Sequence, residues 1–224
     1  MKKLLYLLFA ICLIGCSDSD DVEDTNPVYL DSNGITVKAR DWAAIGDSGI
    51  INGVLYTIVR DDFLILGNDL TRICTSRITE IRKLNLGSNF NQDISSWDVS
   101  NVTRMGEIFR EATSFNGDIS AWDVSNVTRM GEMFSGATSF NQDLSDWDVS
   151  NVTDMRSMFL GATAFNRDIS AWDVSQVTDM SFIFFNAESF NQDIGGWDVS
   201  NVVDSSSFDS GALNWQDDYK PNFQ

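Results

Sequence analysis

The sequence predicts an α/β solenoid, a right-handed coil of five 25-residue strand-turn-helix units behind a small N-terminal α/β cap. The first observation is a fixed period, because a phrase of the form FNQDISSWDVSNVTRM is repeated five times. The second is that a unit this small cannot bury its own apolar face, so neighbouring units must stack. The leading phenylalanines are Phe90, Phe115, Phe140, Phe165 and Phe190. The tryptophans are Trp97, Trp122, Trp147, Trp172 and Trp197.

The first segment, residues 1–15, has the features of a lipoprotein signal peptide. Two lysines precede an apolar run from Leu4 to Ile14, which is shorter than the roughly 20 residues that span a bilayer. The run ends in LIGC, which resembles the bacterial lipobox, where the chain is cut before the cysteine and the thiol is lipidated. We therefore expect lipid attachment at Cys16, and a plain signal peptide or short anchor is the alternative.

Residues 16–34 form the next segment, a predicted flexible tether that is acidic and free of aromatic residues over SDSDDVEDTN. Ser17 after the cysteine resembles outer-membrane sorting rather than inner-membrane retention. Acidic residues so close to the lipidated cysteine are also similar to the surface-export signals of some outer-membrane lipoproteins. The expected location is the outer membrane with exposure at the cell surface, and a position facing the periplasm is the alternative.

Residues 35–83 are predicted to form the N-terminal cap. Asn52-Gly53 lies between two apolar β-forming runs and predicts a two-residue hairpin. The segment IRKLNLGSN then matches the strand segment of a leucine-rich repeat. Cys74 has no cysteine partner once the signal is removed and Cys16 is lipidated, so we expect a buried apolar position, with a reactive thiol as the alternative.

The repeats are expected to cover residues 84–213. The second half of each unit has apolar residues at the spacing of one helix face, which predicts a helix of two to three turns capped by Ser100 or Asn101 in the first unit. The first half is too short for two strands and predicts one short strand and a turn. In the first unit the helix-face residues are Val102, Met105, Ile108, Phe109 and Ala112.

The fifth unit is expected to close the stack. Ser205 and Asp209 stand where the earlier units have methionine and phenylalanine, and terminal repeats turn polar where they meet water. Residues 214–224 then form a C-terminal closing segment.

These residues resemble a known family. The repeat FNQDISSWDVSNVTRMGEIFREAT is similar to the BspA-type leucine-rich repeats, the DUF285 repeat family, of bacterial surface proteins, over about Leu84 to Leu213. The segment NGITVKARDWAAIGDSGIINGVLYTIV resembles the cap that precedes such arrays. The resemblance implies a leucine-rich-repeat-like fold and a surface location, and it implies an adhesin-like role in binding matrix proteins or in co-aggregation.

The composition argues against several classes of function. The chain has no histidine, which removes histidine-based nucleophile systems and imidazole metal sites, and no glycine-rich phosphate loop is present. A net charge of −18 disfavours nucleic acid and anionic lipid surfaces as partners. Carboxylates are abundant, but they recur in every unit, whereas a glycosidase needs one defined pair. We therefore expect no catalysis and no cofactor.

Two ladders of aspartates recur with the period. They are expected to hold turns through local backbone N–H bonds, and the alternative is that a ladder collects Ca²⁺, which prefers oxygen ligands. The candidate Ca²⁺ ladder is Asp98, Asp123, Asp148, Asp173 and Asp198. The other ladder is Asp93, Asp118, Asp143, Asp168 and Asp193. The tryptophans raise a similar choice, with core positions expected and a partly exposed row that stacks on sugars as the alternative.

The position after Phe-Asn varies between units. If it faces outward, these residues form a polar strip across the stack, and solenoids bind partners on such surfaces. The candidate ligand-binding residues there are Gln92, Gln142, Arg167 and Gln192, with Gly117 in the second unit.

The expected function is a lipid-anchored surface protein that binds an extracellular protein or glycan through its repeats. A structural or spacer lipoprotein without a ligand is the alternative, and a carbohydrate-active enzyme is a distant one.

Overall fold

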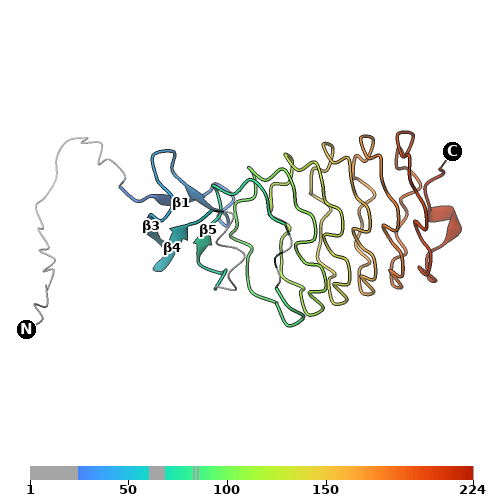
Figure 1. The fold of residues 1–224 in the computed structure, drawn as a ribbon, viewed down its shortest axis with the longest axis horizontal. Coiled ribbons are helices and arrows are strands. Elements are labelled where there is room, and N and C mark those ends of the chain that lie inside the picture. The colour runs from blue at the N-terminus through green and yellow to red at the C-terminus, as the bar shows by residue number, and fades with distance from the viewer. Residues whose placement is uncertain (1–24, 61–68, 83, 85, 224) are drawn as a thin grey trace, which may run out of the picture.

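The computed structural model describes residues 25–60, 69–82, 84 and 86–223, which form one elongated body with a group of short strands at one end (Figure 1). Strands β1 (Val28–Leu30) and β2 (Val37–Ala39) form an antiparallel pair. Strands β3 (Ser48–Ile51) and β4 (Val54–Ile58) form a second antiparallel pair, and β5 (Ile73–Cys74) joins β4 in parallel.

The hairpin predicted at Asn52-Gly53 is confirmed. Ile51 pairs with Val54, so Asn52 and Gly53 are the two loop residues between β3 and β4. Their φ angles are 51° and 81°, the left-handed values that the favoured two-residue hairpin turn requires. Strand β1 lies within residues 16–34, the segment predicted to be a flexible tether, so the cap begins earlier than the predicted residue 35. The described parts of the cap, 25–60 and 69–82, contain strands and turns without an α-helix, which differs from the predicted α/β cap.

The cap is joined to the first repeat through buried polar contacts. The Val37 N–H donates to the carbonyl of Ser96 over 2.9 Å, and the Thr75 hydroxyl donates to the carbonyl of Asp98 over 2.9 Å. The Asp98 carboxylate is buried and accepts a hydrogen bond from the Ser76 hydroxyl. Cys74 lies in the small core of the cap, and burial raises the pKa of its thiol, as expected for an apolar position.

The repeats form a row of stacked coils, which we number 1 to 5 from Phe90, Phe115, Phe140, Phe165 and Phe190. Figure 1 shows successive coils side by side from the green to the orange part of the chain. Each coil is hydrogen-bonded to the next through alternate residues. The amides of Met105, Glu107 and Phe109 in coil 1 donate to the carbonyls of Arg129, Gly131 and Met133 in coil 2, over 2.9 to 3.1 Å.

One residue of each coil forms an isolated parallel β-bridge with its equivalent in the next coil. We call this row the bridge row. It runs through Glu80, Arg104, Arg129, Asp154, Asp179 and Asp204.

The helix predicted in the second half of each unit is not found, and turns take its place. Its amides donate to the following coil, whereas an α-helix would use them within the segment. Left-handed residues interrupt the segment twice, as at Glu132 with φ of 60° and Gly136 with φ of 72° in coil 2. The short strand predicted in the first half is also not found, and turns and irregular backbone take its place.

The turns explain why the apolar spacing looks helical. Inward side chains three residues apart are joined by hydrogen bonds from the N–H of the second residue to the C=O of the first. In coil 2 such bonds join Met133 to Met130 over 3.2 Å, and Ala137 to Phe134 over 3.0 Å. A chain of three-residue turns therefore places every third residue inward, close to the period of one helix face.

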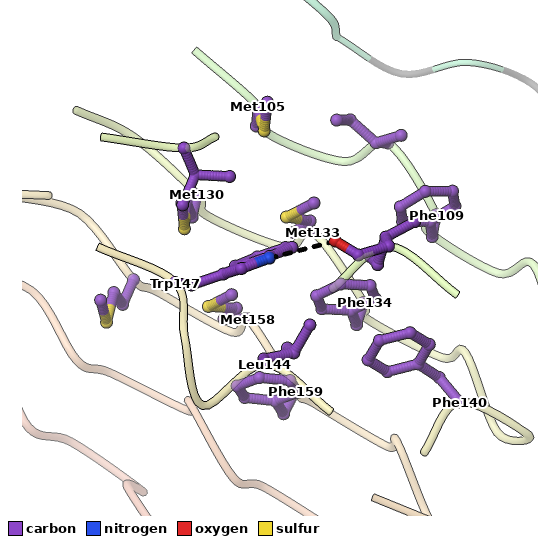
Figure 2. Packing of buried hydrophobic residues seen from close by; sticks show 14 of the residues in the cluster. Met105, Phe109, Met130, Met133, Phe134, Phe140, Leu144, Trp147, Met158 and Phe159 are labelled. Carbon is purple, nitrogen blue, oxygen red and sulfur yellow. Dashed lines mark hydrogen bonds between the residues drawn. The ribbon is translucent and has the colours of Figure 1, made fainter. Parts of the chain in front are cut away.

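The core is built from columns of stacked aromatic rings that pass through the coils. Figure 2 shows Phe134 between Phe109 and Phe159, with Phe140 beside it. The ring centroid of Phe134 lies 5.5 Å from that of Phe109, 5.6 Å from that of Phe159 and 4.0 Å from that of Phe140. Such stacked pairs add about 0.5–1.5 kcal/mol each beyond the burial of their area. The same spacing recurs along the stack, so each ring holds two neighbouring coils together.

The tryptophans are core residues, as predicted. Each of the five repeated indoles is at most 5% exposed. Each indole N–H also donates to a backbone carbonyl of the preceding turn of the chain, as Trp147 does to Ile119 over 3.2 Å (Figure 2). The polar N–H edge of each buried indole therefore has a hydrogen-bond partner.

The last coil is covered by residues 214–223, which include the 3-10 helix η2 (Asp217–Tyr219). The Ile194 N–H donates to the carbonyl of Tyr219 over 2.9 Å, and Trp215 packs against Phe208 with ring centroids 5.7 Å apart. Asp209 pairs with Lys220 over 2.9 Å. The polar substitution in the fifth unit therefore places a carboxylate against a lysine of the covering segment.

Candidate functional site

The predicted lipid-attachment residue, Cys16, lies in residues 1–24, outside the described part of the chain. Among the described residues, no helix is long and apolar enough to cross a bilayer.

The predicted binding strip follows the position after Phe-Asn. The Gln142 amide donates to the carbonyl of Asn116 over 3.0 Å and to its side-chain oxygen over 2.9 Å. Gln192 makes the same pair of bonds to Asn166, and Gln92 accepts a hydrogen bond from the N–H of Leu70. The glutamine amides thus join one turn of the chain to the one before it, which sequence reasoning did not foresee.

Arg167 is the exposed cation of this strip. Its Nε donates to the carbonyl of Asn141 over 2.7 Å, in the place that glutamine amides take in the neighbouring coils. The N–H and hydroxyl of Ser145 hold the pKa of Asp143 below its ordinary value, and the charge of Arg167 adds to this effect. The side chain of Arg167 therefore lies on the surface near an aspartate of the neighbouring coil.

The predicted Ca²⁺ ladder holds turns. Asp123 accepts hydrogen bonds from both the N–H and the hydroxyl of Ser125, over 3.2 and 2.6 Å, and its equivalents bond the residue two positions on in the same way. These bonds lower the pKa of Asp173 and Asp198. Within the described residues no three acidic or thiol groups come together to hold a metal ion, so the geometry adds no support for Ca²⁺ on this ladder.

An asparagine ladder was missed at the sequence level. In coils 1 to 4 the asparagine after the leading phenylalanine accepts, through its side-chain oxygen, the N–H of the equivalent asparagine in the next coil, and in coil 5 Asn191 accepts the N–H of Gln216. The distances are 2.9 to 3.0 Å. The signal was present, because this asparagine occurs in all five units. The ladder is Asn91, Asn116, Asn141, Asn166 and Asn191.

A charged hollow over coils 1 to 3 was also missed. It has a volume of about 340 Å³ and lies beside the bridge row. We call it the arginine hollow. Its lining residues are Arg82, Arg104, Gly106, Glu107, Arg129, Gly131, Glu132, Asp154 and Arg156.

Ion pairs fix part of the lining of the arginine hollow. Glu132 accepts from Arg110 over 2.8 Å and from Arg156 over 2.9 Å, and Glu107 pairs with Arg110 over 3.0 Å. Arg110 thus pairs with both of these glutamates. The hollow thus combines neutralised pairs with the guanidinium groups of the bridge row.

Comparison with known proteins places the repeats in a family. A search of curated proteins and a search of solved structures found no match. A protein-family model described as "Mycoplasma protein of unknown function, DUF285" matches residues 58–152 and 141–222, which include all five coils. The match covers well over half of the chain, and it lies on the repeats whose stacking is described above. The chain therefore belongs to the DUF285 family.

Proposed function

We propose that this chain is a non-catalytic, adhesin-like binding protein that recognises an extracellular protein or glycan on the exposed face of its coils. The observation that carries the proposal is the contrast between two neighbouring positions of the repeat. The position two residues before the bridge row is valine in every coil. The bridge row itself changes from arginine in coils 1 and 2 to aspartate in coils 3 to 5.

This contrast separates a constant frame from a varied surface. The frame consists of aromatic columns, backbone bonds between coils and the asparagine ladder. The bridge-row side chains are exposed or half-buried, so their chemistry can differ without disturbing the frame. A stack of such coils supports an extended recognition surface, as in other repeat proteins.

We also propose where the protein lies in the cell. The LIGC motif and the acidic residues after it support a BspA-type lipoprotein of the outer membrane with its repeats exposed at the cell surface. Cys16→Ser should release the protein from the membrane fraction and abolish incorporation of a labelled fatty acid. A variant that still sediments with membranes and keeps the label would contradict lipid attachment at this residue.

Binding is tested with the full-length protein immobilised against a panel of extracellular matrix proteins and glycans. We expect saturable binding to at least one member, and competition by the soluble protein. If no member binds, the spacer alternative is favoured over the proposal. Release of products from the glycans during the assay would favour a carbohydrate-active enzyme.

The binding face is then located with three exchange variants. In each, an exposed residue is replaced by the one that an adjacent coil has at the same position, so the frame is kept. The variants are Arg129→Asp, Phe182→Ser and Arg167→Gln. At least one should weaken binding without changing the urea midpoint; if none does, the exposed face of the coils is not the binding surface.

A further inference from the structure

We infer that the arginine hollow binds the carboxylate of an anionic saccharide, of the kind that contains a uronic acid. This inference rests on the proposed function, because it names the ligand class and the place on the coils. The bridge-row guanidinium groups would hold the carboxylate, and the acidic side chains of the lining would accept from sugar hydroxyls.

Two glycines make the space. Coils 1 and 2 have Gly106 and Gly131 two residues after the bridge row, where the later coils have Arg156, Ser181 and Ser206. A Cβ added at Gly131 would lie 3.2 Å from the Asp154 carboxylate, so even one more carbon would crowd the lining. The volume of about 340 Å³ lies at the lower end of the range for small-ligand sites, roughly 300–1,000 Å³.

The charges of the bridge row favour an anion. Arg104 and Arg129 are paired with each other in the ladder, and like charges on directly paired positions destabilise a sheet. Arg104 has one ion-pair contact, 3.5 Å from Glu80, which also pairs with Arg82 over 3.2 Å. Within the described residues, the Arg129 side chain has no hydrogen bond or ion pair. An anion between Arg104 and Arg129 would offset their repulsion and accept hydrogen bonds from both.

The acidic lining favours a saccharide over an acidic polypeptide. Glu107 and Glu132 are already paired with arginines, and Asp154 accepts from the N–H of Arg156 over 3.1 Å. Each carboxylate has four acceptor sites, so it can still accept a hydroxyl proton. A uronic acid brings one charge and several hydroxyl donors, whereas a run of acidic residues would bring further negative charges against Glu132 and Asp154.

The test measures binding to the full-length protein by calorimetry. The probe is a tetrasaccharide of alternating glucuronate and N-acetylglucosamine, compared with a neutral N-acetylglucosamine tetrasaccharide and an oligoglutamate peptide. Arg129→Gln should weaken binding of the anionic tetrasaccharide by about tenfold or more, since hydrogen bonds to charged groups contribute that much to affinity. Arg72→Gln is the matched control, because Arg72 is exposed in the cap and does not line the hollow, so the variant removes the same charge elsewhere and should change the affinity by less than about twofold.

A second variant separates shape from charge. Gly131→Ser keeps every arginine and introduces the residue that coils 4 and 5 have at this position, so the coil should still fold. It should weaken binding because it fills the hollow.

The outcomes are distinguishable. Equal binding of the anionic tetrasaccharide to the wild type, Arg129→Gln and Gly131→Ser would overturn the assignment of the site while the proposed function stands. Binding of the peptide alone would overturn the ligand class. If none of the three probes binds, the inference fails, and the broader panel decides separately whether the protein has another ligand.

Discussion

Replacing Phe134 by alanine tests whether the aromatic columns hold the coils together. The ring is fully buried, and its neighbours Phe109 and Phe159 belong to the coils on either side. Truncating a buried phenylalanine costs about 3–5 kcal/mol of unfolding free energy. We expect the upper half of this range, because the backbone on both sides is fixed. The N–H of Phe109 donates to Met133 over 2.9 Å, and that of Phe134 donates to Met158 over 2.9 Å, so the coils cannot move in to fill the cavity.

Phe208→Ala is the matched comparison at the end of the stack. Phe208 has a coil on one side, where Phe184 lies 5.6 Å away, and the short covering segment with Phe223 at 4.8 Å on the other. That segment can shift toward the cavity, so we expect a loss of about 2–3 kcal/mol.

Both variants are compared with the wild type in urea melts, followed by circular dichroism and by tryptophan fluorescence. Equal losses of unfolding free energy at the two positions would refute the argument that a ring between two coils contributes more to stability than a ring at the end of the stack. If Phe134→Ala does not fold, Phe134→Leu should still show a loss of about 1–2 kcal/mol.

Three further outcomes are expected. Arg167→Glu should weaken binding to any ligand held by the predicted polar strip while lowering stability by no more than about 1 kcal/mol, the usual net value of one hydrogen bond; unchanged affinity in a titration would contradict a role for this residue. Gly136→Ala should cost about 1–2 kcal/mol in a urea melt, since its φ is 72° and the new Cβ would lie 3.0 Å from the Glu111 carboxylate; an unchanged midpoint would mean that the left-handed turn is not needed. The N–H and hydroxyl of Ser170 lower the pKa of Asp168 from its ordinary 3.8, so this carboxylate stabilises the fold above that pH and its contribution is lost as the pH falls through the lower folded-state pKa. Asp168→Asn should therefore reduce stability at neutral pH and flatten the acid part of the stability profile, whereas parallel profiles would contradict this role.

Much of the core was predictable from the sequence because the period aligns equivalent positions. Val102, Met105, Ile108, Phe109 and Ala112 were grouped as one apolar face, and all five are buried. The prediction of a helix in the second half of each unit was wrong, because successive three-residue turns place side chains inward at nearly the same spacing as a helix does. The left-handed turns could not be predicted from residue type either. Glu107 and Phe182 adopt φ of 60° and 57°, although neither residue favours positive φ.

The arginine hollow was not predictable for a different reason. Its lining residues come from turns of the chain that are about 25 positions apart, so Arg104 and Arg129 are neighbours in space without a local pattern. The two glycines that leave the space occur in the first two coils alone among the five. A search for motifs shared by every unit passes over residues whose role depends on the difference between units.

The bonds between coils have a consequence for how such a chain can change over generations. Each coil donates to the next through the same alternate amides and accepts from the one before through the same carbonyls. A duplication or loss of one whole 25-residue segment in the gene would therefore rejoin matching edges and leave every remaining bond in register. A gain or loss of any other length would bring unlike edges together. Unequal recombination between the near-identical segments thus offers a route to longer or shorter stacks in which single exposed residues can then diverge.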